Sequence, residues 1–390
     1  MKLLSFVCAG LCASVQQLDM PVNVKALHWN ILGGKTLAAS KFFGHAAPTL
    51  TGSASGISKN FVWGPQQHAN DKPAMLDWEQ RSKLMFQILS ESKADILTFV
   101  EMENYEDFEA ALGQQGYNGK YLKRPGSRTD GTALFWRENL FELMSSEDVL
   151  LSEKTGRVAL LCRLKLKNES VGESGAHDLT LVGTHLHWDA NTPQQIAEAS
   201  FLKDHLSQEI AKSPKVPVLL GGDMNTEKGG PSFAELCKND MQPMEVGDSV
   251  SWTNWIPETA YWTKQWGAET AGWAWKEPKK VIIDHFLMYP ATGALSMTQP
   301  VTPVFRTPDG SIASEKDLSE MVPLTGNDAL VPKEEQPDWK DSFKQGGSEA
   351  EAWLPLRKTE TPEVGIPNKE NPSDHLPIIA HLQLTPASSS

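Results

Sequence analysis

The feature that most constrains the fold is a regular alternation, from Val22 onward, of apolar runs of strand length with amphipathic segments of helical period. Runs such as "ADILTFV" and "VPVLLGG" are almost continuously apolar. Strands of this kind are buried on both faces, so a sheet built from them needs cover from helices or from another sheet. The alternation therefore predicts an α/β architecture in which helices cover the sheets.

The same patterns place the expected elements along the chain. Helical periodicity covers residues 75–92, 105–116 and 193–212. Strands are expected over residues 23–32, 94–102, 131–137, 157–166, 178–188, 216–223, 279–289 and 376–384. The polar segment 167–177 has the composition of a hairpin loop, which predicts that the strands on either side of it are antiparallel neighbours.

The organisation is that of one domain over residues 20–384. Residues 34–60 are small and polar and are expected to form a surface loop, and residues 299–371 a long loop insertion. The tail 385–390 is expected to be disordered. Residues 1–17 have the layout of a secretory signal peptide, which predicts a secreted protein or one of the secretory pathway. A plain N-terminal strand and a cytoplasmic protein are the alternative.

The charge balance limits the classes of partner. The formal net charge is −13, from 49 acidic and 36 basic side chains. That balance argues against broad binding to a polyphosphate backbone, which needs a basic surface. A nucleic acid would have to be held locally, with the help of a divalent cation. No apolar run approaches the roughly 18–20 residues that a membrane span requires.

Polar residues stand where the apolar strands end. They are Asn30, Glu101, His185, Asp223, Asn225 and Asp284, and "PSDH" places Asp374 and His375 just before the last strand. Strand ends hold side chains on a rigid scaffold while loops shape a pocket. If the last strand is antiparallel, its beginning lies at the same sheet edge as the other strand ends. The set is then expected to converge.

Carboxylates and amide oxygens without a cluster of thiolates are hard ligands, suited to Mg²⁺, with Mn²⁺ as the alternative. Bound by a few carboxylates and by substrate phosphate, such an ion activates phosphate esters. His375 can supply positive charge to a transition state. Asp374 is its sequence neighbour, but a distant carboxylate is an equally good candidate to orient it.

The ordered series of these residues resembles the endonuclease/exonuclease/phosphatase superfamily, closest to the branch of carbon-catabolite-repression type deadenylases and nocturnin. The segments that carry the resemblance are "LHWNIL" (27–32), "LDWEQRSKLMFQIL" (76–89), "ADILTFVEMENYEDF" (94–108), "RTDGTALFWR" (128–137), "THLHWD" (184–189), "GGDMNT" (221–226), "VIIDHFLMY" (281–289) and "GIPNKENPSDHLPI" (365–378). The resemblance implies a four-layer sandwich, with two mixed β-sheets packed face to face and flanked by helices.

The resemblance also implies roles. Glu101 would be the principal metal ligand, in a site of one or two ions to which Asp223, Asn225 and Asp374 contribute. Asp223 would orient and deprotonate the attacking water. Asn30 would position Asp223 and a phosphate oxygen, and His185 would contact the phosphate. Asp284 would be a further metal-site or orienting carboxylate, and His375, supported by the catalytic residue Asp374, would stabilise the pentacoordinate transition state.

Three departures from the family pattern are visible. Val100 stands where the family usually has Gln, His285 where it usually has Tyr, and Ala190 where the deadenylase branch has the proline of "HWDP". The last departure weakens the expectation of adenine preference. We expect Trp275, or else Trp273, to stack on a substrate base. Arg128, in a short basic cluster, would hold substrate phosphate, or the cluster is simply a solvated loop.

The sequence thus predicts a metal-dependent phosphodiesterase, in first place a 3′-5′ exoribonuclease of the deadenylase type that acts on single-stranded RNA and releases nucleoside 5′-monophosphates. The alternative on the same scaffold is a phosphomonoesterase or a small-molecule or lipid phosphodiesterase, such as a dinucleotide 2′-phosphatase or a sphingomyelinase-like enzyme. A binding module without activity is disfavoured because the polar series is complete.

Overall fold

The computed structural model describes residues 21–33, 78–167, 178–247, 253–256, 259–263, 272–276, 279–304, 306, 372–373 and 375–385. The expected signal segment 1–17, the loop 34–60 and the part of the insertion beyond residue 306 lie outside the described residues. None of the described helices is long and apolar enough to cross a membrane.

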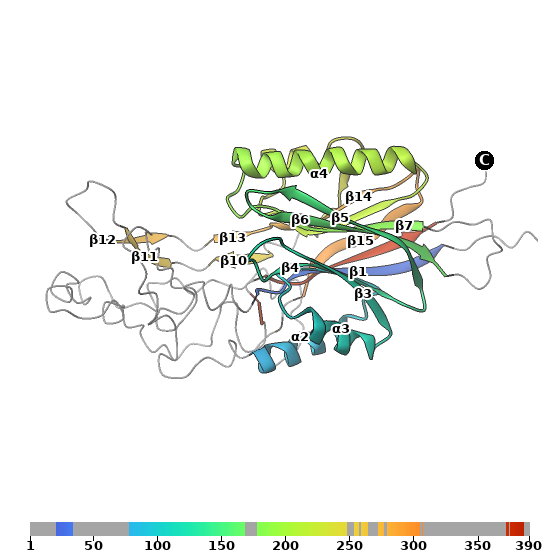
Figure 1. Ribbon diagram of the computed structural model, residues 1–390, viewed down its shortest axis with the longest axis horizontal. Helices are drawn as coiled ribbons and strands as arrows, with labels where there is room; N and C mark the ends of the chain where they lie inside the picture. Colours follow the sequence, from blue (N-terminus) through green and yellow to red (C-terminus); the bar gives the residue numbers. More distant parts are fainter. Residues whose placement is uncertain are drawn as a thin grey trace, which may run out of the picture.

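Two six-stranded sheets form the body of the protein (Figure 1). The first, sheet A, has the order β15-β16-β1-β2-β4-β3, with β1 and β2 parallel and the other neighbours antiparallel. Its strands are β1 (Val22–Asn30), β2 (Ile96–Val100), β3 (Tyr117–Lys123), β4 (Gly131–Arg137), β15 (Leu295–Pro303) and β16 (Ile378–Leu384). The last strand is antiparallel to β1, as expected.

The second sheet, sheet B, has the order β5-β6-β7-β8-β14-β9, and only β7 and β8 are parallel within it. Its strands are β5 (Phe141–Ser152), β6 (Arg157–Leu166), β7 (Asp178–His185), β8 (Val218–Asp223), β9 (Gln242–Pro243) and β14 (Asp284–Tyr289). Two short pairs lie apart from it, β10 (Asn254–Ile256) with β13 (Lys279–Val281) and β11 (Thr259–Thr263) with β12 (Gly272–Lys276).

The two sheets pack face to face through one apolar core. Inward-facing residues of sheet A, such as Ala26 and Leu134, and of sheet B, such as Leu181 and Phe286, belong to the same buried cluster. The burial explains why β2 and β8 read as continuous apolar runs: every residue of both strands is buried, since one face meets the other sheet and the opposite face meets a helix.

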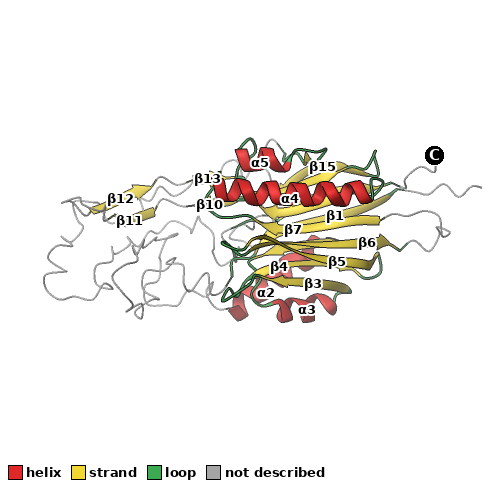
Figure 2. Ribbon diagram, turned by 45° about the horizontal axis from the view of Figure 1, so that its top comes forward, coloured by secondary structure: helices red, strands yellow, loops and turns green. Residues whose placement is uncertain are grey.

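Helices cover the outer faces of both sheets (Figure 2). Helices α2 (Trp78–Ser92) and α3 (Tyr105–Gly113) pack on sheet A, where Met85 and Phe108 join the buried cluster around Phe99. Helices α4 (Pro193–Lys212) and α5 (Pro231–Leu236) pack on sheet B, where Leu202 and Phe233 surround its outward side chains. The four-layer sandwich of two mixed sheets with outer helices is therefore confirmed.

Three expectations about elements differ from the structure. The segment 279–289 divides into β13 and β14, separated by Ile282 and Ile283, because the first part pairs with β10 and the second with β8. Strand β15 continues to Pro303, so the insertion begins after the position expected. Strands β3 and β5 lacked an apolar signal because β3 is mostly half-buried and seven successive residues of β5 are exposed.

Two consecutive glycines let the sheets and strands approach closely at β8. A Cβ added to Gly221 would lie 2.7 Å from Thr98 Oγ1 and 2.8 Å from Phe286 Cε1. A Cβ added to Gly222 would lie 2.5 Å from the Thr184 carbonyl oxygen. All three distances are shorter than the contacts that a Cβ atom makes in real structures. The glycines of "VPVLLGGD" therefore let the strand run close beside its neighbours to its last residue, Asp223.

We expect Gly221→Ala to destabilise the fold by about 1–3 kcal/mol, since the added methyl group enters a filled interface between the sheets. Urea denaturation followed by circular dichroism measures the change. Gly113→Ala is the matched control: its Cβ would meet no atom within 4 Å, so its stability should stay within about 0.5 kcal/mol of wild type. Equal stability of all three proteins would show that the contact at Gly221 is not tight.

Candidate active site

Strand ends from both sheets meet at one edge of the sandwich, which we call the site edge. The register of the strand pairs in sheet B defines this edge. His185 pairs with Asp223 between β7 and β8, and Asp223 pairs with Asp284 between β8 and β14. Sheet A supplies its residues opposite them. The side chains that gather there are Asn30, Glu101 and His375 from sheet A and its loops, and His185, Asp223, Asn225 and Asp284 from sheet B and its loops.

Asn30 joins the two sheets. Its Nδ2 donates to Asp223 Oδ2 over 3.0 Å and to Glu101 Oε1 over 3.2 Å. Its Oδ1 accepts from the Leu32 amide, which fixes the orientation of the carboxamide. One amide therefore holds two carboxylates, one from each sheet, at a spacing set by its own NH2 group.

The backbone is turned sharply at two of these residues. Glu101 and Asn225 both have positive φ, 56° and 50° respectively, a conformation that residues other than glycine adopt rarely. Each stands just beyond the end of a buried strand. The turn brings Glu101 Oε2 within 3.2 Å of the Gly33 amide, and the Asn225 amide donates to Asp223 Oδ1 over 2.8 Å. Backbone strain of this kind is concentrated at functional sites, because the surrounding structure must hold it.

His185 lies between Asn225 and Asp223. Its Nε2 is 2.9 Å from Asn225 Nδ2 and 3.4 Å from Asp223 Oδ2. Burial lowers the pKa of His185 well below its usual value, and the nearby charge of Arg157 lowers it further. The imidazole is therefore neutral at pH 7 and acts as a hydrogen-bonding group rather than as a cation.

The histidine of the final segment takes its partner from β14. His375 Nδ1 lies 2.8 Å from Asp284 Oδ2, and its Nε2 points toward Asp223, 3.7 Å from Oδ2. The orienting carboxylate is thus Asp284, distant in sequence. This is the second of the two arrangements that the sequence left open. Asp374, expected as a metal and catalytic residue, lies outside the described residues.

The two buried aspartates differ in their proton affinity. Burial raises the pKa of Asp223 to about 6, and the neighbouring Asp284 charge contributes to the increase. Burial would raise the pKa of Asp284 as well, but the flanking His375 and His28 imidazoles more than offset it and hold the pKa below its usual value. Two carboxylates whose pKa values are pushed apart can divide the roles of proton acceptor and fixed negative charge.

The donor set fits a hard divalent cation. Glu101 and Asp223 offer carboxylate oxygens across one small space, and Asn225 and Asn30 border it with amides. The carboxylates accept hydrogen bonds from neutral amide groups, and Asp223 Oδ2 also lies 3.4 Å from His185 Nε2 and 3.7 Å from His375 Nε2. A cation placed among them would relieve the cost of burying Asp223, whose raised pKa reports that cost. Mg²⁺ or Mn²⁺ suits such oxygen ligands.

A second group of metal-binding side chain types lies away from the site edge. Glu147 of β5 and His205 and Glu209 of α4 bring ligand atoms within 4.8 Å of one another. Glu147 is half exposed, and Glu209 Oε1 already forms an ion pair with Lys212 Nζ at 2.5 Å. This group therefore has the character of a surface ion-pair network.

Two further expected residues are not brought to the site by the described atoms. Trp275 belongs to β12, and its side chain lies outside the described residues. Arg128 is half-buried, and its Nη1 and Nη2 donate to the carbonyl oxygens of Pro125 and Lys154. Its guanidinium covers Gly156, where an added Cβ would lie 2.7 Å from Nη1. In this structure Arg128 supports a turn.

The sequence did not reveal His28. It faces sheet B from the middle of β1, with Nε2 3.3 Å from Asp284 Oδ1 and Nδ1 2.9 Å from Thr98 Oγ1. Both His28 and Asp284 are completely buried. Asp284 is therefore flanked by two imidazoles, one on each oxygen. The only sequence signal was a histidine within an otherwise apolar strand.

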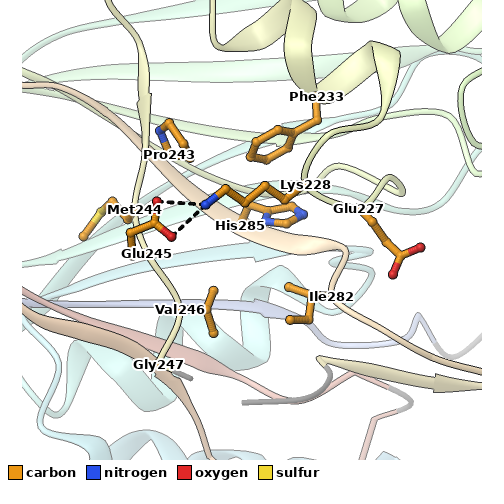
Figure 3. A pocket seen from close by; sticks show the side chains of 10 residues that line it. All are labelled: Glu227, Lys228, Phe233, Pro243, Met244, Glu245, Val246, Gly247, Ile282 and His285. Carbon is orange, nitrogen blue, oxygen red and sulfur yellow. Dashed lines mark hydrogen bonds and ion pairs between the residues drawn. The ribbon is translucent and has the colours of Figure 1, made fainter. Parts of the chain in front are cut away.

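A pocket of about 370 Å³ lies beside the site but on the other face of sheet B (Figure 3). Side chains alternate along β14, so Asp284 points between the sheets and His285 points outward to Phe233 of α5. The ion pair of Lys228 with Glu245 crosses the pocket wall. His285 Nε2 lies 2.9 Å from the Thr226 carbonyl oxygen, so the histidine at the position where the resemblance leads one to expect tyrosine points away from the side chains of the site edge.

Residues 27–375 match the "Endonuclease/Exonuclease/phosphatase family", a range that covers every residue discussed above from His28 to His375. Among curated proteins, Nocturnin of Mus musculus is 31% identical over 219 residues, which cover 52% of this chain and 43% of that protein. "Carbon catabolite repressor protein 4 homolog 5" of Arabidopsis thaliana is 27% identical over 161 residues, which cover 39% of this chain and 36% of that protein. The matches thus span about a third to a half of the length of these relatives.

Solved structures share the fold over almost the whole chain. The human Nocturnin catalytic domain with bound sulfate anion superimposes with a TM-score of 0.51 at 17% identity, covering 94% of this chain and 97% of that chain. ANGEL2, a 2′,3′-cyclic phosphatase, in complex with adenosine-2′,3′-vanadate, gives a TM-score of 0.55 at 14% identity, covering 93% and 96%. At these identities the likeness establishes the architecture alone.

We expect His28→Leu to destabilise the protein by about 3–5 kcal/mol, because it removes the imidazole that lies 3.3 Å from one oxygen of the buried Asp284. His28→Gln, which keeps a polar group of similar length, should retain most of that stability. Guanidinium denaturation of both variants beside wild type measures the difference. If His28→Leu is as stable as His28→Gln, the contact between the sheets does not stabilise Asp284.

Proposed function

The chain belongs to the endonuclease/exonuclease/phosphatase family, and from this premise we propose that it is a hydrolase of phosphate esters that depends on a divalent cation. Family members are hydrolases that act on phosphate esters. The observation that carries the proposal is the arrangement of Glu101, Asp223 and His375, which come from distant parts of the chain and both sheets and share one buried edge.

The residues divide the reaction between them. Asp223, whose pKa burial raises to about 6, accepts the proton of the attacking water as the water oxygen bonds to phosphorus. The bond from phosphorus to the leaving ester oxygen breaks in the same displacement, and that oxygen leaves as an alcohol after it takes a proton from solvent. Asn30 and Asn225 hold the Asp223 carboxylate so that its direction does not change. Catalytic side chains that are already held in the reactive geometry before the substrate binds account for a large part of the rate enhancement in phosphoryl transfer.

Positive charge for the transition state comes from His375. Its Nδ1 is held by Asp284, so Nε2 is directed toward Asp223 and the space before it. An ionised Asp284 favours the imidazolium form, which donates to the oxygen on which charge develops. Neutral His185, held by Asn225, offers a further hydrogen bond to the phosphate.

A divalent cation bound chiefly by Glu101, with Asp223 and Asn225 beside it, would supply Lewis-acid polarisation of the phosphate. The ion is Mg²⁺ in this proposal, with Mn²⁺ as the alternative.

For the substrate, we propose the 3′ end of single-stranded RNA, with release of nucleoside 5′-monophosphates. The support is the sequence likeness to Nocturnin and to carbon catabolite repressor protein 4 homologues, together with the deadenylase-type segments "THLHWD" and "WEQR". Trp188, the tryptophan of "THLHWD", is 68% exposed and lies in the loop that follows His185. An exposed indole at the site edge is suited to stacking on a base.

A second candidate function is hydrolysis of a small phosphomonoester or of a dinucleotide. The acidic balance, with 49 acidic against 36 basic side chains, favours a substrate with little backbone to hold. This candidate predicts release of inorganic phosphate from small esters while RNA stays intact.

We expect Mg²⁺ or Mn²⁺ to raise the unfolding temperature of the wild-type protein, since an ion that binds only the folded state stabilises it, by about 2.7 kcal/mol at 100 times its dissociation constant. Glu101→Gln should lose most of this increase, because the carboxylate that attracts the ion is gone. Differential scanning calorimetry with and without EDTA measures it. An equal increase in both proteins would place the ion elsewhere.

We expect the wild-type protein to shorten 5′-labelled oligo(A) from its 3′ end in the presence of Mg²⁺, and Asp223→Asn to do so about 10²–10³ times more slowly, because the proton acceptor is lost. Asp178→Asn, which removes the partner of Arg163 at the opposite end of β7, is the control and should retain wild-type rates. Denaturing gels resolve the products. Intact RNA together with phosphate release from small esters would favour the second candidate.

A further inference from the structure

Arg157 stands at the site edge although no sequence pattern marked it. It is the first residue of β6, and β6 runs antiparallel to β7, so its beginning lies beside the end of β7 where His185 is placed. The pairing of Ala159 with Thr184 fixes this register. Arg157 is therefore a neighbour of the catalytic groups, contributed by a strand that gave none of the expected site residues.

The guanidinium of Arg157 is buried without partners. The residue is only 6% exposed, and among the described residues Nε and Nη1 have no hydrogen-bond partner. Burial lowers the pKa of Arg157 to about 10, so the group stays positively charged at neutral pH. A buried charge with unmet donors costs several kcal/mol, and native structures rarely keep one without a use for it.

The other two arginines of this region do have partners. Arg124 donates to Asp130 Oδ2 over 2.8 Å and to the Thr155 carbonyl oxygen over 2.7 Å. Arg128 covers Gly156, whose φ of 63° needs the freedom of glycine. Both therefore brace the turn between β5 and β6. Among the three described arginines near this turn, Arg157 is therefore the one whose guanidinium keeps N–H groups without hydrogen-bond acceptors.

The turn is also fixed from the side of α4. Thr155 Oγ1 donates to Glu198 Oε1 over 2.6 Å, and the His187 amide donates to the other oxygen, Oε2, over 2.8 Å. Glu198 is 1% exposed. One buried carboxylate thus ties the turn that precedes Arg157 to the loop that follows His185, so that Arg157 is held in place relative to the catalytic loop.

The charge of Arg157 acts on the catalytic groups. Glu101 and Asp223 are among the charges that raise its pKa, and Arg157 is in turn a cause of the lowered pKa of His185. The guanidinium therefore lies within electrostatic range of the carboxylates expected to hold the cation and of the histidine expected to meet the phosphate. A phosphate ester entering this space brings negative oxygens that match its unmet donors.

We propose that Arg157 is a substrate-binding residue that donates to a non-bridging oxygen of the scissile phosphate. The inference rests on the proposed function, since it assigns a phosphate to this site. It adds a permanent cation to a reaction for which the sequence analysis named only histidines and Arg128 as positively charged groups.

This role and a structural role differ in their effect on stability. A structural arginine is paired in the folded protein, so its replacement destabilises the fold. An arginine that binds a substrate anion is an unpaired buried charge in the free protein, and this lowers the stability of the fold. Replacing it with an apolar side chain of similar length removes the buried charge and its cost. Arg157→Met should therefore leave the unfolding temperature unchanged or raise it in buffer without phosphate or sulfate.

The test is calorimetric titration of the metal-free full chain with inorganic phosphate, beside thermal unfolding. We expect Arg157→Met to bind phosphate about 10–100 times more weakly than wild type, because charge-assisted hydrogen bonds are lost. Arg157→Lys, which keeps the charge, should stay within about tenfold of wild type. Arg163→Met, at the far end of β6, is the control and should bind phosphate normally.

Equal phosphate affinity of wild type and Arg157→Met, or a lowered unfolding temperature of Arg157→Met, would overturn the inference. The outcome is separable from that of the proposed function, because binding needs no turnover. A wild-type protein that binds phosphate through Arg157 but cleaves no ester contradicts the proposed function alone. If the ester is cleaved and kcat/KM is unchanged in Arg157→Met, only the inference fails.

Discussion

The site depends on ionised side chains being shared between two sheets in a space that excludes water. Asp284 of sheet B is completely buried, and it is accommodated because His28 of sheet A and His375 of the final segment contact one oxygen each. Asn30 makes the corresponding link between Asp223 and Glu101. Both contacts require the sheets to come close at this edge, which Gly221 and Gly222 permit. The glycines and the acid of "LLGGD" therefore belong to one arrangement.

This arrangement brings negatively charged carboxylates and positively charged side chains together at the site edge. Three carboxylates gather at the site edge, while Arg157 of sheet B and His375 of the final segment provide positive charge. The amides of Asn30 and Asn225 hold Asp223 and His185 in place between them. A divalent cation would neutralise part of the charge of the carboxylates, and a phosphate would neutralise the charge of the positively charged side chains. Burial makes these interactions stronger than they would be at an open surface.

The sequence predicted the parts of the fold that depend on local pattern. Buried strands such as β2 and β8 and the long helix α4 carry apolar or amphipathic signals, and polar residues at strand ends pointed to a common edge. Strand β5 was missed because its side chains are mostly exposed. His28 and Arg157 were missed for another reason: their importance comes from contacts across sheets and strands, at separations in sequence that no short motif records. The partner of His375 could not be chosen from sequence either, because its neighbour Asp374 and the distant Asp284 were equally suitable in type.

The most direct measurement of the central claim is the anomalous scattering of Mn²⁺ in crystals of the protein soaked with the ion. Our account predicts a peak at the site edge, in contact with Glu101 and beside Asp223, between the ends of the two sheets. A peak only at Glu147, His205 and Glu209, with none beside Glu101, would contradict it, because the buried carboxylates would then have converged without forming the cation site.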